Sequence, residues 1–468
     1  MSDGLHALSA VELVAAYRAG SLAPVEVVRD VLRRIERWEP HLRATYALDA
    51  EGALAQAEAS QARWLKGEPQ GALDGVPVTI KENIATHGVP VPLGTAATEL
   101  VPAAMDAPPA ARLREAGAVI LGKTTMPDYG MLSSGLSSFH PLTRNPWDLT
   151  KNPGGSSAGA AAAAAAGYGP LHVGTDIGGS VRLPAAWCGI VALKPSLGRI
   201  PIDPPYAGRV AGPMTRTVAD AALLMRVLSR PDARDTMSLP WQDIEWERLD
   251  RDARGLRIGL QLDAGWGLAV EPETRAAVEA AAKRFEAAGA IVEPVPPFMT
   301  RAMIAGMDAF WRCRSWMEIS SLPEARRAKV LPYILEWARG GAALTGEEVF
   351  RGYSQMGAMR EAAVAACAGF DVLISPTSPV PAYAAEWASP TNDPAQPFEH
   401  IAFTLPFNMS EQPSASVNCG YTSSGLPIGL QISGHRHDDL GVLQVVRLWE
   451  QLRPAQRPWP QPPSGDPR

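Results

Sequence analysis

Hydrophobic positions in the first seventy residues follow a helical period. The stretch Ser9-Ala10-Val11-Glu12 has the form of a capping box, which predicts a helix over 9–18. A proline at position 24 favours the start of a second helix, over 24–38. Its apolar face is formed by Val27, Val31, Leu32 and Ile35. A third amphipathic, alanine-rich helix is predicted over 53–66.

Short apolar runs replace this pattern farther along the chain, and they predict strands. The predicted strands lie at 76–80, 118–121, 257–260, 291–292, 371–376, 414–419 and 428–433. Helical patterns occur at 217–229 and 271–288, so strands and helices alternate. Such alternation is typical of an α/β fold, and we expect a twisted, mixed β-sheet covered by helices.

No internal repeat or clear linker divides the chain, which is therefore expected to form a single large domain over 1–468. The segment 296–352 is rich in Trp, Met and Arg and is predicted to be helical, either as an insert that covers a cleft or as part of the shell. Its residues Met303, Met307, Trp311 and Trp316 are expected mainly in the core. The tail, 453–468, contains six prolines and is predicted to be extended and loosely held.

Composition limits the classes of function. Hydrophobic residues make up 46% of the 468 residues and charged residues 20%, which is ordinary for a globular protein. The net charge of −6 gives no basic surface excess for nucleic acid or an anionic membrane. The N-terminus lacks a signal-peptide pattern, and the four widely spaced cysteines suggest free thiols in a reducing compartment. We therefore expect a cytoplasmic protein without a metal site.

Candidate chemistry is concentrated in two glycine-rich stretches, 152–159 and 174–182. Glycines allow tight turns in which consecutive backbone N–H groups point into one concavity. Such a concavity can stabilise the oxyanion that forms when a carbonyl is attacked. Ser180 follows Gly178 and Gly179 and could be the attacking group, although a serine hydroxyl needs a base.

The base is not an obvious histidine, because none of the eight histidines stands in a recognisable partnership with these serines. Lys81 continues the apolar strand predicted at 76–80 and is the better candidate. Burial lowers the pKa of a lysine, so a neutral amine could accept a proton near neutral pH.

Two other stretches match known sequence motifs in form, but their surroundings do not fit those motifs. Residues 117–124 fit the P-loop pattern, but their interior reads as a strand rather than a phosphate-binding loop. Residues 155–159 fit G-x-S-x-G, with Ser157 as the nucleophile. That nucleophile elbow requires a preceding strand, whereas the residues before it read as a turn.

The chain resembles the amidase signature family, most strongly over 74–216. The motifs are GVPVTIKEN at 75–83, GKTTMPD at 122–128, NPW at 145–147, PGGSS at 153–157, GTDIGGSVR at 174–182 followed by Pro184, DVLISP at 371–376 and GLPIGLQ at 425–431. Ala158 and Tyr129 depart from the residues common in the family, at positions outside the proton relay.

The resemblance implies a role for each matching residue. Lys81 corresponds to the catalytic base, Ser156 to a bridging serine after a cis peptide bond, and Ser180 to the nucleophile. The backbone N–H groups of Ile177, Gly178, Gly179 and Ser180 would form the oxyanion hole. Asp176 and Arg182 would brace this loop, and the pocket beside the acyl site would include Tyr129, Gly130, Met131 and Leu132.

The implied activity is hydrolysis of a carboxamide to a carboxylate and ammonia or an amine, without a metal or organic cofactor. One alternative is the glutamine-amidase subunit of an aminoacyl-tRNA amidotransferase. Others are a hydrolase for a urea-like, carbamate or lactam substrate, and a non-enzymatic binding protein. The expected partner is a small-molecule amide, with an apolar acyl group favoured over a charged one, and a homodimer is expected on general grounds.

Overall fold

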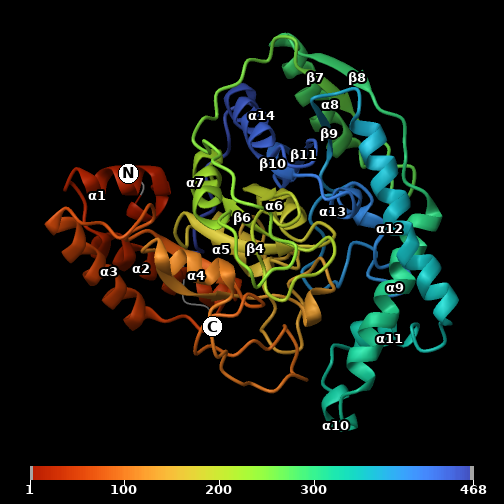
Figure 1. Cartoon of the computed structure of the whole chain (residues 1–468), viewed down its shortest axis with the longest axis horizontal. Coiled ribbons are helices and arrows are strands. Elements are labelled where there is room, and N and C mark those ends of the chain that lie inside the picture. The colour runs from red at the N-terminus through yellow and green to blue at the C-terminus, as the bar shows by residue number, and fades with distance from the viewer. Residues whose placement is uncertain (1–3, 464–468) are drawn as a thin grey trace.

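The computed structural model describes residues 4–463. Residues 1–3, at the N-terminus predicted to lack a signal peptide, and residues 464–468 of the proline-rich tail lie outside the described residues. One α/β domain is formed around a single large sheet, as predicted (Figure 1).

Eleven strands form this sheet, in the order β1-β3-β2-β4-β6-β5-β10-β11-β9-β7-β8. Their bounds are β1 Thr45–Tyr46, β2 Pro77–Lys81, β3 Val119–Thr124, β4 Leu171–Asp176, β5 Val191–Lys194, β6 Val210–Thr215, β7 Arg257–Leu260, β8 Ile291–Pro294, β9 Val372–Pro376, β10 Ser414–Tyr421 and β11 Pro427–Ser433. Strand β2 pairs in parallel with β3 and β4, whereas β4 pairs antiparallel with β6. The sheet is therefore mixed, as the alternation of elements predicts.

Helices surround the sheet. Their bounds are α1 Ala10–Arg18, α2 Pro24–Leu42, α3 Ala50–Lys66, α4 Pro108–Glu115, α5 Ala158–Ala166, α6 Arg182–Cys188, α7 Val218–Leu228, α8 Pro272–Ala287, α9 Arg301–Ser320, α10 Glu324–Arg327, α11 Pro332–Arg339, α12 Gly346–Cys367, α13 Leu405–Met409 and α14 Asp439–Leu452; three short 3-10 helices span Leu5–Ala7, Asp128–Gly130 and Glu399–Ile401. In Figure 1, α1 to α3 lie on one side of the molecule, and α9, α11 and α12 lie on the other. No helix within 4–463 is long and apolar enough to cross a membrane.

Local sequence signals placed the N-terminal helices correctly. The Ser9 side chain accepts a hydrogen bond from the Glu12 backbone N–H, and the Glu12 carboxylate accepts one from the Ser9 N–H, which completes the predicted capping box. Helix α2 begins at Pro24, as predicted. Its last turn extends past the predicted end and stops at Arg43, which has a left-handed backbone conformation.

Three central strands, β4, β5 and β6, were not predicted. Every residue in them is buried, so no alternation of polar and apolar side chains marks them as strands. Strand β6 also contains Gly212 and Pro213, which usually interrupt a strand pattern. This part of the sheet matters for function because β4 leads into the 174–182 motif.

The alanine run forms α5, and all nine of its residues are buried. Helix α5 packs against β4 and α6. The absence of larger side chains allows this helix to lie close to the sheet. Its first residue directly follows Ser157, so the rigid helix fixes the position of the 152–157 loop.

The described part of the tail, residues 453–463, is extended as predicted but is not loosely held. The Trp459 ring lies under the Arg216 guanidinium, with 4.7 Å between the guanidinium carbon and the ring centroid. Arg34 donates to the Gln461 side chain at 2.6 Å. Aromatic and charge-assisted contacts, which a proline count does not reveal, hold this segment on the domain.

Candidate active site

Strand pairing brings the two separated motifs together. Strands β2 and β4 are parallel neighbours, with Ile80 opposite Val173. Their carboxyl ends therefore lie at the same edge of the sheet, where Lys81 ends β2 and Asp176 ends β4. The N-terminus of α5 brings Ser156 and Ser157 to the same place.

Lys81 is completely buried, and its hydrogen-bond partners within 4–463 are all uncharged. Its Nζ lies 2.7 Å from Ser156 Oγ, 3.0 Å from Ser157 Oγ and 3.0 Å from the Oγ1 of Thr175. Burial holds the pKa of Lys81 well below its usual value, and the positive charge of Arg209 lowers it further. A neutral amine at this position can accept a proton from a hydroxyl.

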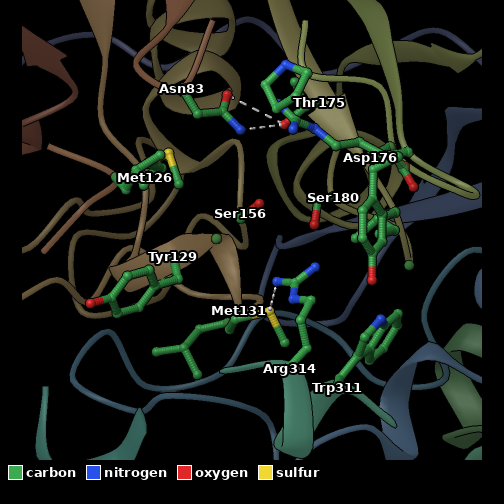
Figure 2. A pocket seen from close by; sticks show the side chains of 18 of the residues that line it. Asn83, Met126, Tyr129, Met131, Ser156, Thr175, Asp176, Ser180, Trp311 and Arg314 are labelled. Carbon is green, nitrogen blue, oxygen red and sulfur yellow. Dashed lines mark hydrogen bonds between the residues drawn. The ribbon is translucent and has the colours of Figure 1, made fainter. Parts of the chain in front are cut away.

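The two serines of the expected relay line one cavity. The Gly155–Ser156 peptide bond is cis, as the resemblance implies. Figure 2 shows the side chains of Ser156 and Ser180 among the residues that line this cavity. Within 4–463, Ser180 Oγ makes no hydrogen bond to another residue, so the structure joins Lys81 to Ser156 and leaves the Ser180 hydroxyl facing the cavity.

Of the four backbone N–H groups expected to form an oxyanion hole, three have no protein acceptor within 4–463 and one does. The N–H of Gly179 donates to Asp176 Oδ1 at 2.8 Å, so it is engaged inside the loop. In the described part of the chain, the N–H groups of Ile177, Gly178 and Ser180 have no protein acceptor. These three remain available for a developing oxyanion.

Asp176 and Arg182 form a buried ion pair, as expected. Both side chains are fully buried, and Arg182 Nη2 lies 3.0 Å from Asp176 Oδ1. Burial alone would raise the pKa of Asp176, but Arg182 and several N–H donors hold that pKa below its ordinary value. Arg182 also donates to the Thr404 carbonyl and the side chains of Gln431 and Asn408. The pair thus ties the 174–182 loop to the C-terminal half of the chain.

Arg182→Met is expected to lower the free energy of unfolding by about 3–5 kcal/mol, because it leaves the Asp176 charge buried without its partner. Chemical denaturation measures this loss. Arg226→Met serves as the control, since Arg226 and Glu247 form an exposed pair whose loss should cost less than about 1 kcal/mol. Equal losses for the two variants would contradict a bracing role for Arg182.

A cavity of about 600 Å³ opens in front of the serines. The four predicted pocket residues, Tyr129, Gly130, Met131 and Leu132, all line it. Helix α9 contributes Trp311, which therefore reaches the cavity, while Met303 and Met307 are buried in the core. The ring of Trp311 also packs edge-on against Phe398.

Sequence reasoning missed other residues at the site. Thr175 contacts Lys81 and also accepts a hydrogen bond from the Asn83 amide at 3.1 Å. Both residues lie inside motifs that the sequence analysis used, 174–182 and 75–83. Their place in those motifs was a signal that could have identified them, although no role was assigned to them. Arg209 and Arg314 also line the cavity, and nothing in their local sequence indicated this position.

The stretches that resemble a P-loop, 117–124, and a nucleophile elbow, 155–159, have other structural roles. The interior of 117–124 is strand β3, and the Lys123 amine donates to the Ile84 carbonyl and to Thr86. Ser157 is fully buried and donates to the Thr175 carbonyl, and it follows loops rather than a strand. Neither motif therefore has the geometry that its chemistry requires. Among residues 4–463, no group of three or more His, Cys, Asp or Glu could hold a metal ion.

Comparison with known proteins supports the class of enzyme that the sequence motifs imply. The Amidase family profile matches residues 26–443, so the chain belongs to the amidase family. It is 36% identical to a glutamyl-tRNA(Gln) amidotransferase subunit of Myxococcus xanthus, over 95% of this chain and 96% of that protein. It is 34% identical to an acylamidase of Rhodococcus erythropolis, over 97% of each chain.

Among solved structures, a bacterial aryl acylamidase of the amidase signature family superposes with a TM-score of 0.88 and 30% identity, over 96% of each chain. The predicted family and fold class are thus confirmed. The chain is an amidase-type hydrolase that acts on carbon–nitrogen bonds other than peptide bonds.

Proposed function

We propose that Lys81, Ser156 and Ser180 form the catalytic relay and that the enzyme hydrolyses small carboxamides through an acyl-enzyme on Ser180. One observation carries the proposal. A buried lysine amine lies 2.7 Å from Ser156 Oγ, and Ser156 lines the same cavity as Ser180. A lysine with a lowered pKa and no carboxylate among its hydrogen-bond partners is suited to take up a proton rather than to hold a structural charge.

In the first half-reaction, neutral Lys81 accepts the Ser156 proton as Ser156 accepts the Ser180 proton. Ser180 Oγ then bonds to the carbonyl carbon, and the free N–H groups of Ile177, Gly178 and Ser180 stabilise the oxyanion. The carbon–nitrogen bond breaks as the relay returns a proton to the leaving nitrogen. Ammonia or an amine departs and an ester remains on Ser180.

In the second half-reaction, water attacks that ester. The same relay takes a proton from the water and returns one to Ser180 Oγ. The products are a carboxylic acid, which ionises, and the regenerated enzyme. We assign Tyr129, Met131 and Leu132 to the pocket for the acyl group, because they line the cavity next to Ser156.

Labelling with a fluorophosphonate is expected to place one adduct on the peptide that contains Ser180. The activated hydroxyl attacks phosphorus and displaces fluoride. Peptide mass spectrometry locates the adduct, and the Ser180→Ala variant is the control. An adduct on Ser157, or none on a folded protein, would contradict the assignment.

A second candidate function follows from the likeness to the amidotransferase protein of Myxococcus xanthus. Such a protein would hydrolyse glutamine for a partner protein. Release of ammonia from a panel of substrates, comprising glutamine, aliphatic and aryl amides, a urea, a carbamate and a lactam, separates the candidates. A kcat/KM for glutamine above that for the other amides would favour the amidotransferase function and reject a general amidase.

The proposal includes a cytoplasmic location and a homodimer. The four cysteines are free, and Cys188, Cys367 and Cys419 are buried, which suits a reducing compartment. Light scattering coupled to gel filtration tests the dimer, since a monomeric mass at micromolar concentration would reject it.

A further inference from the structure

Two arginines from distant parts of the chain line the catalytic cavity. Arg209 directly precedes β6, and Arg314 lies on α9. The Arg209 side chain is half-buried and forms no ion pair in the described part of the chain. Burial and the nearby Arg314 charge lower the pKa of Arg209. Both arginines thus line one cavity, where the charge of Arg314 disfavours that of Arg209.

The Arg314 guanidinium is positioned by weak contacts. It lies 5.0 Å from the centroid of the Tyr206 ring, and its Nη2 lies 3.7 Å from the sulfur of Met131. Its Nε is buried without a hydrogen bond and lies 3.8 Å from the carboxylate of Glu318. Figure 2 shows the guanidinium of Arg314 pointing into the cavity towards Ser156 and Ser180.

Acidic side chains around the cavity do not neutralise this pair well. The carboxylate of Asp176 is already bound by Arg182. Asp203 is exposed, and 53% of the Glu318 side chain is exposed, so water screens both charges. Within 4–463, neither arginine therefore has a close, buried carboxylate partner that would prevent it from binding an anionic ligand.

We propose that Arg209 and Arg314 bind a carboxylate of the substrate, so that the enzyme selects amides that carry an anionic group. This inference rests on the proposed function, because it names the substrate class of the same site. A guanidinium presents paired N–H donors that match a carboxylate, and the bound anion would also relieve the repulsion between the two arginines.

The apolar walls remain compatible with this proposal. Met126, Tyr129 and Leu132 line the cavity and suit an apolar acyl chain. The sequence favoured an uncharged acyl group, and the arginines add an anionic site beside that apolar pocket. The carboxylate could then belong to the leaving amine, as in an N-acyl amino acid, or to the acyl part, as in a dicarboxylic monoamide.

Matched substrates test the proposal and show whether the carboxylate belongs to the leaving amine or to the acyl part. N-hexanoylglycine is compared with N-hexanoylpropylamine, and glutaramate is compared with pentanamide, by kcat/KM. We expect the anionic member of one pair to exceed its neutral match by about tenfold or more. The preferred pair identifies the part of the substrate that bears the carboxylate. Equal or greater activity on both neutral substrates would overturn the proposal and leave the amidase function intact.

Variants assign the preference to the two arginines. Arg314→Met and Arg209→Met, which retain the apolar part of each side chain, should each reduce the anionic-to-neutral ratio at least about fivefold, and Arg314→Lys should restore part of it. Arg226→Met, at an exposed pair outside the cavity, should leave the ratio unchanged. An unchanged ratio in both cavity variants would also overturn the proposal.

Binding provides a readout that does not need turnover. Isothermal titration with glutarate, compared with 1,5-pentanediol, should show binding of the dianion only, with affinity reduced at least about fivefold in Arg314→Met. Glutarate binding without amidase activity would reject the proposed function and uphold the anion site. Absence of glutarate binding to a protein active on neutral amides would reject the anion site alone.

Discussion

Ser180→Ala is expected to reduce kcat more than about a hundredfold while leaving the fold intact. In the proposed mechanism this hydroxyl forms the covalent bond to the substrate, and no other serine within 4–463 both lines the cavity and follows the free N–H groups at 177 and 178. Steady-state assays with a chromogenic anilide measure kcat and KM separately. Because the loss concerns a bond made only during reaction, kcat should fall far more than KM changes.

Ser354→Ala is a matched control, since this serine on α12 is exposed and its hydroxyl donates to the nearby Phe350 carbonyl. It should retain full activity and an unchanged Tm. If Ser180→Ala kept more than about one hundredth of the wild-type kcat, Ser180 could not be the nucleophile.

Lys81→Met should reduce kcat as strongly as Ser180→Ala does, for a different reason. In the proposed relay, removal of the amine leaves no base to accept the proton from Ser156, and Ser180 remains a weak nucleophile. In the wild type, burial lowers the pKa of Lys81, so the neutral base persists towards neutral pH. Activity should therefore rise with pH through that lowered pKa, as the amine loses its proton, and fall on acidification.

The pH profile of kcat/KM distinguishes this base from a structural lysine. Lys81→Met should remain inactive at high pH, where solvent hydroxide cannot replace a positioned amine. Lys123→Met is the matched control, because burial lowers the pKa of Lys123 to about 7 but its amine donates to the Ile84 carbonyl and Thr86 rather than to a serine. The Lys123→Met variant is expected to have a lower Tm, while the acidic limb of its kcat/KM profile stays at the same pH as in the wild type. Full activity in Lys81→Met would rule out the base role.

Much of the outer fold could be read from local patterns. A capping box at Ser9 and a proline at position 24 specify helix starts through backbone geometry that neighbouring residues supply. Predicted strands at 76–80 and 118–121 correspond to β2 and β3 because apolar, β-branched runs mark buried strands. The central strand β6 was not predicted, because burial on both faces removes the alternation of polar and apolar side chains. In addition, Gly212 and Pro213 are typical of a turn.

The proposed relay residues come from the motif resemblance rather than from physical derivation. Glycines before Ser180 suggested a turn with free N–H groups, and Lys81 at the end of an apolar run suggested a buried amine. Neither observation could give the distance between Lys81 Nζ and Ser156 Oγ, because that distance depends on the pairing of β2 with β4 and on the packing of α5.

The sequence by itself thus determined the local elements, the family motifs and the residue types needed for acyl transfer. Tertiary structure alone decided which backbone N–H groups of the loop before Ser180 remain free, since the Asp176 carboxylate accepts a hydrogen bond from the N–H of Gly179. It also brought Arg209 and Arg314 into one cavity from a segment before β6 and from α9. Local patterns reflect forces between near neighbours in the chain, whereas the charge and shape of a cavity arise from segments that meet only when the sheet and its helices have packed.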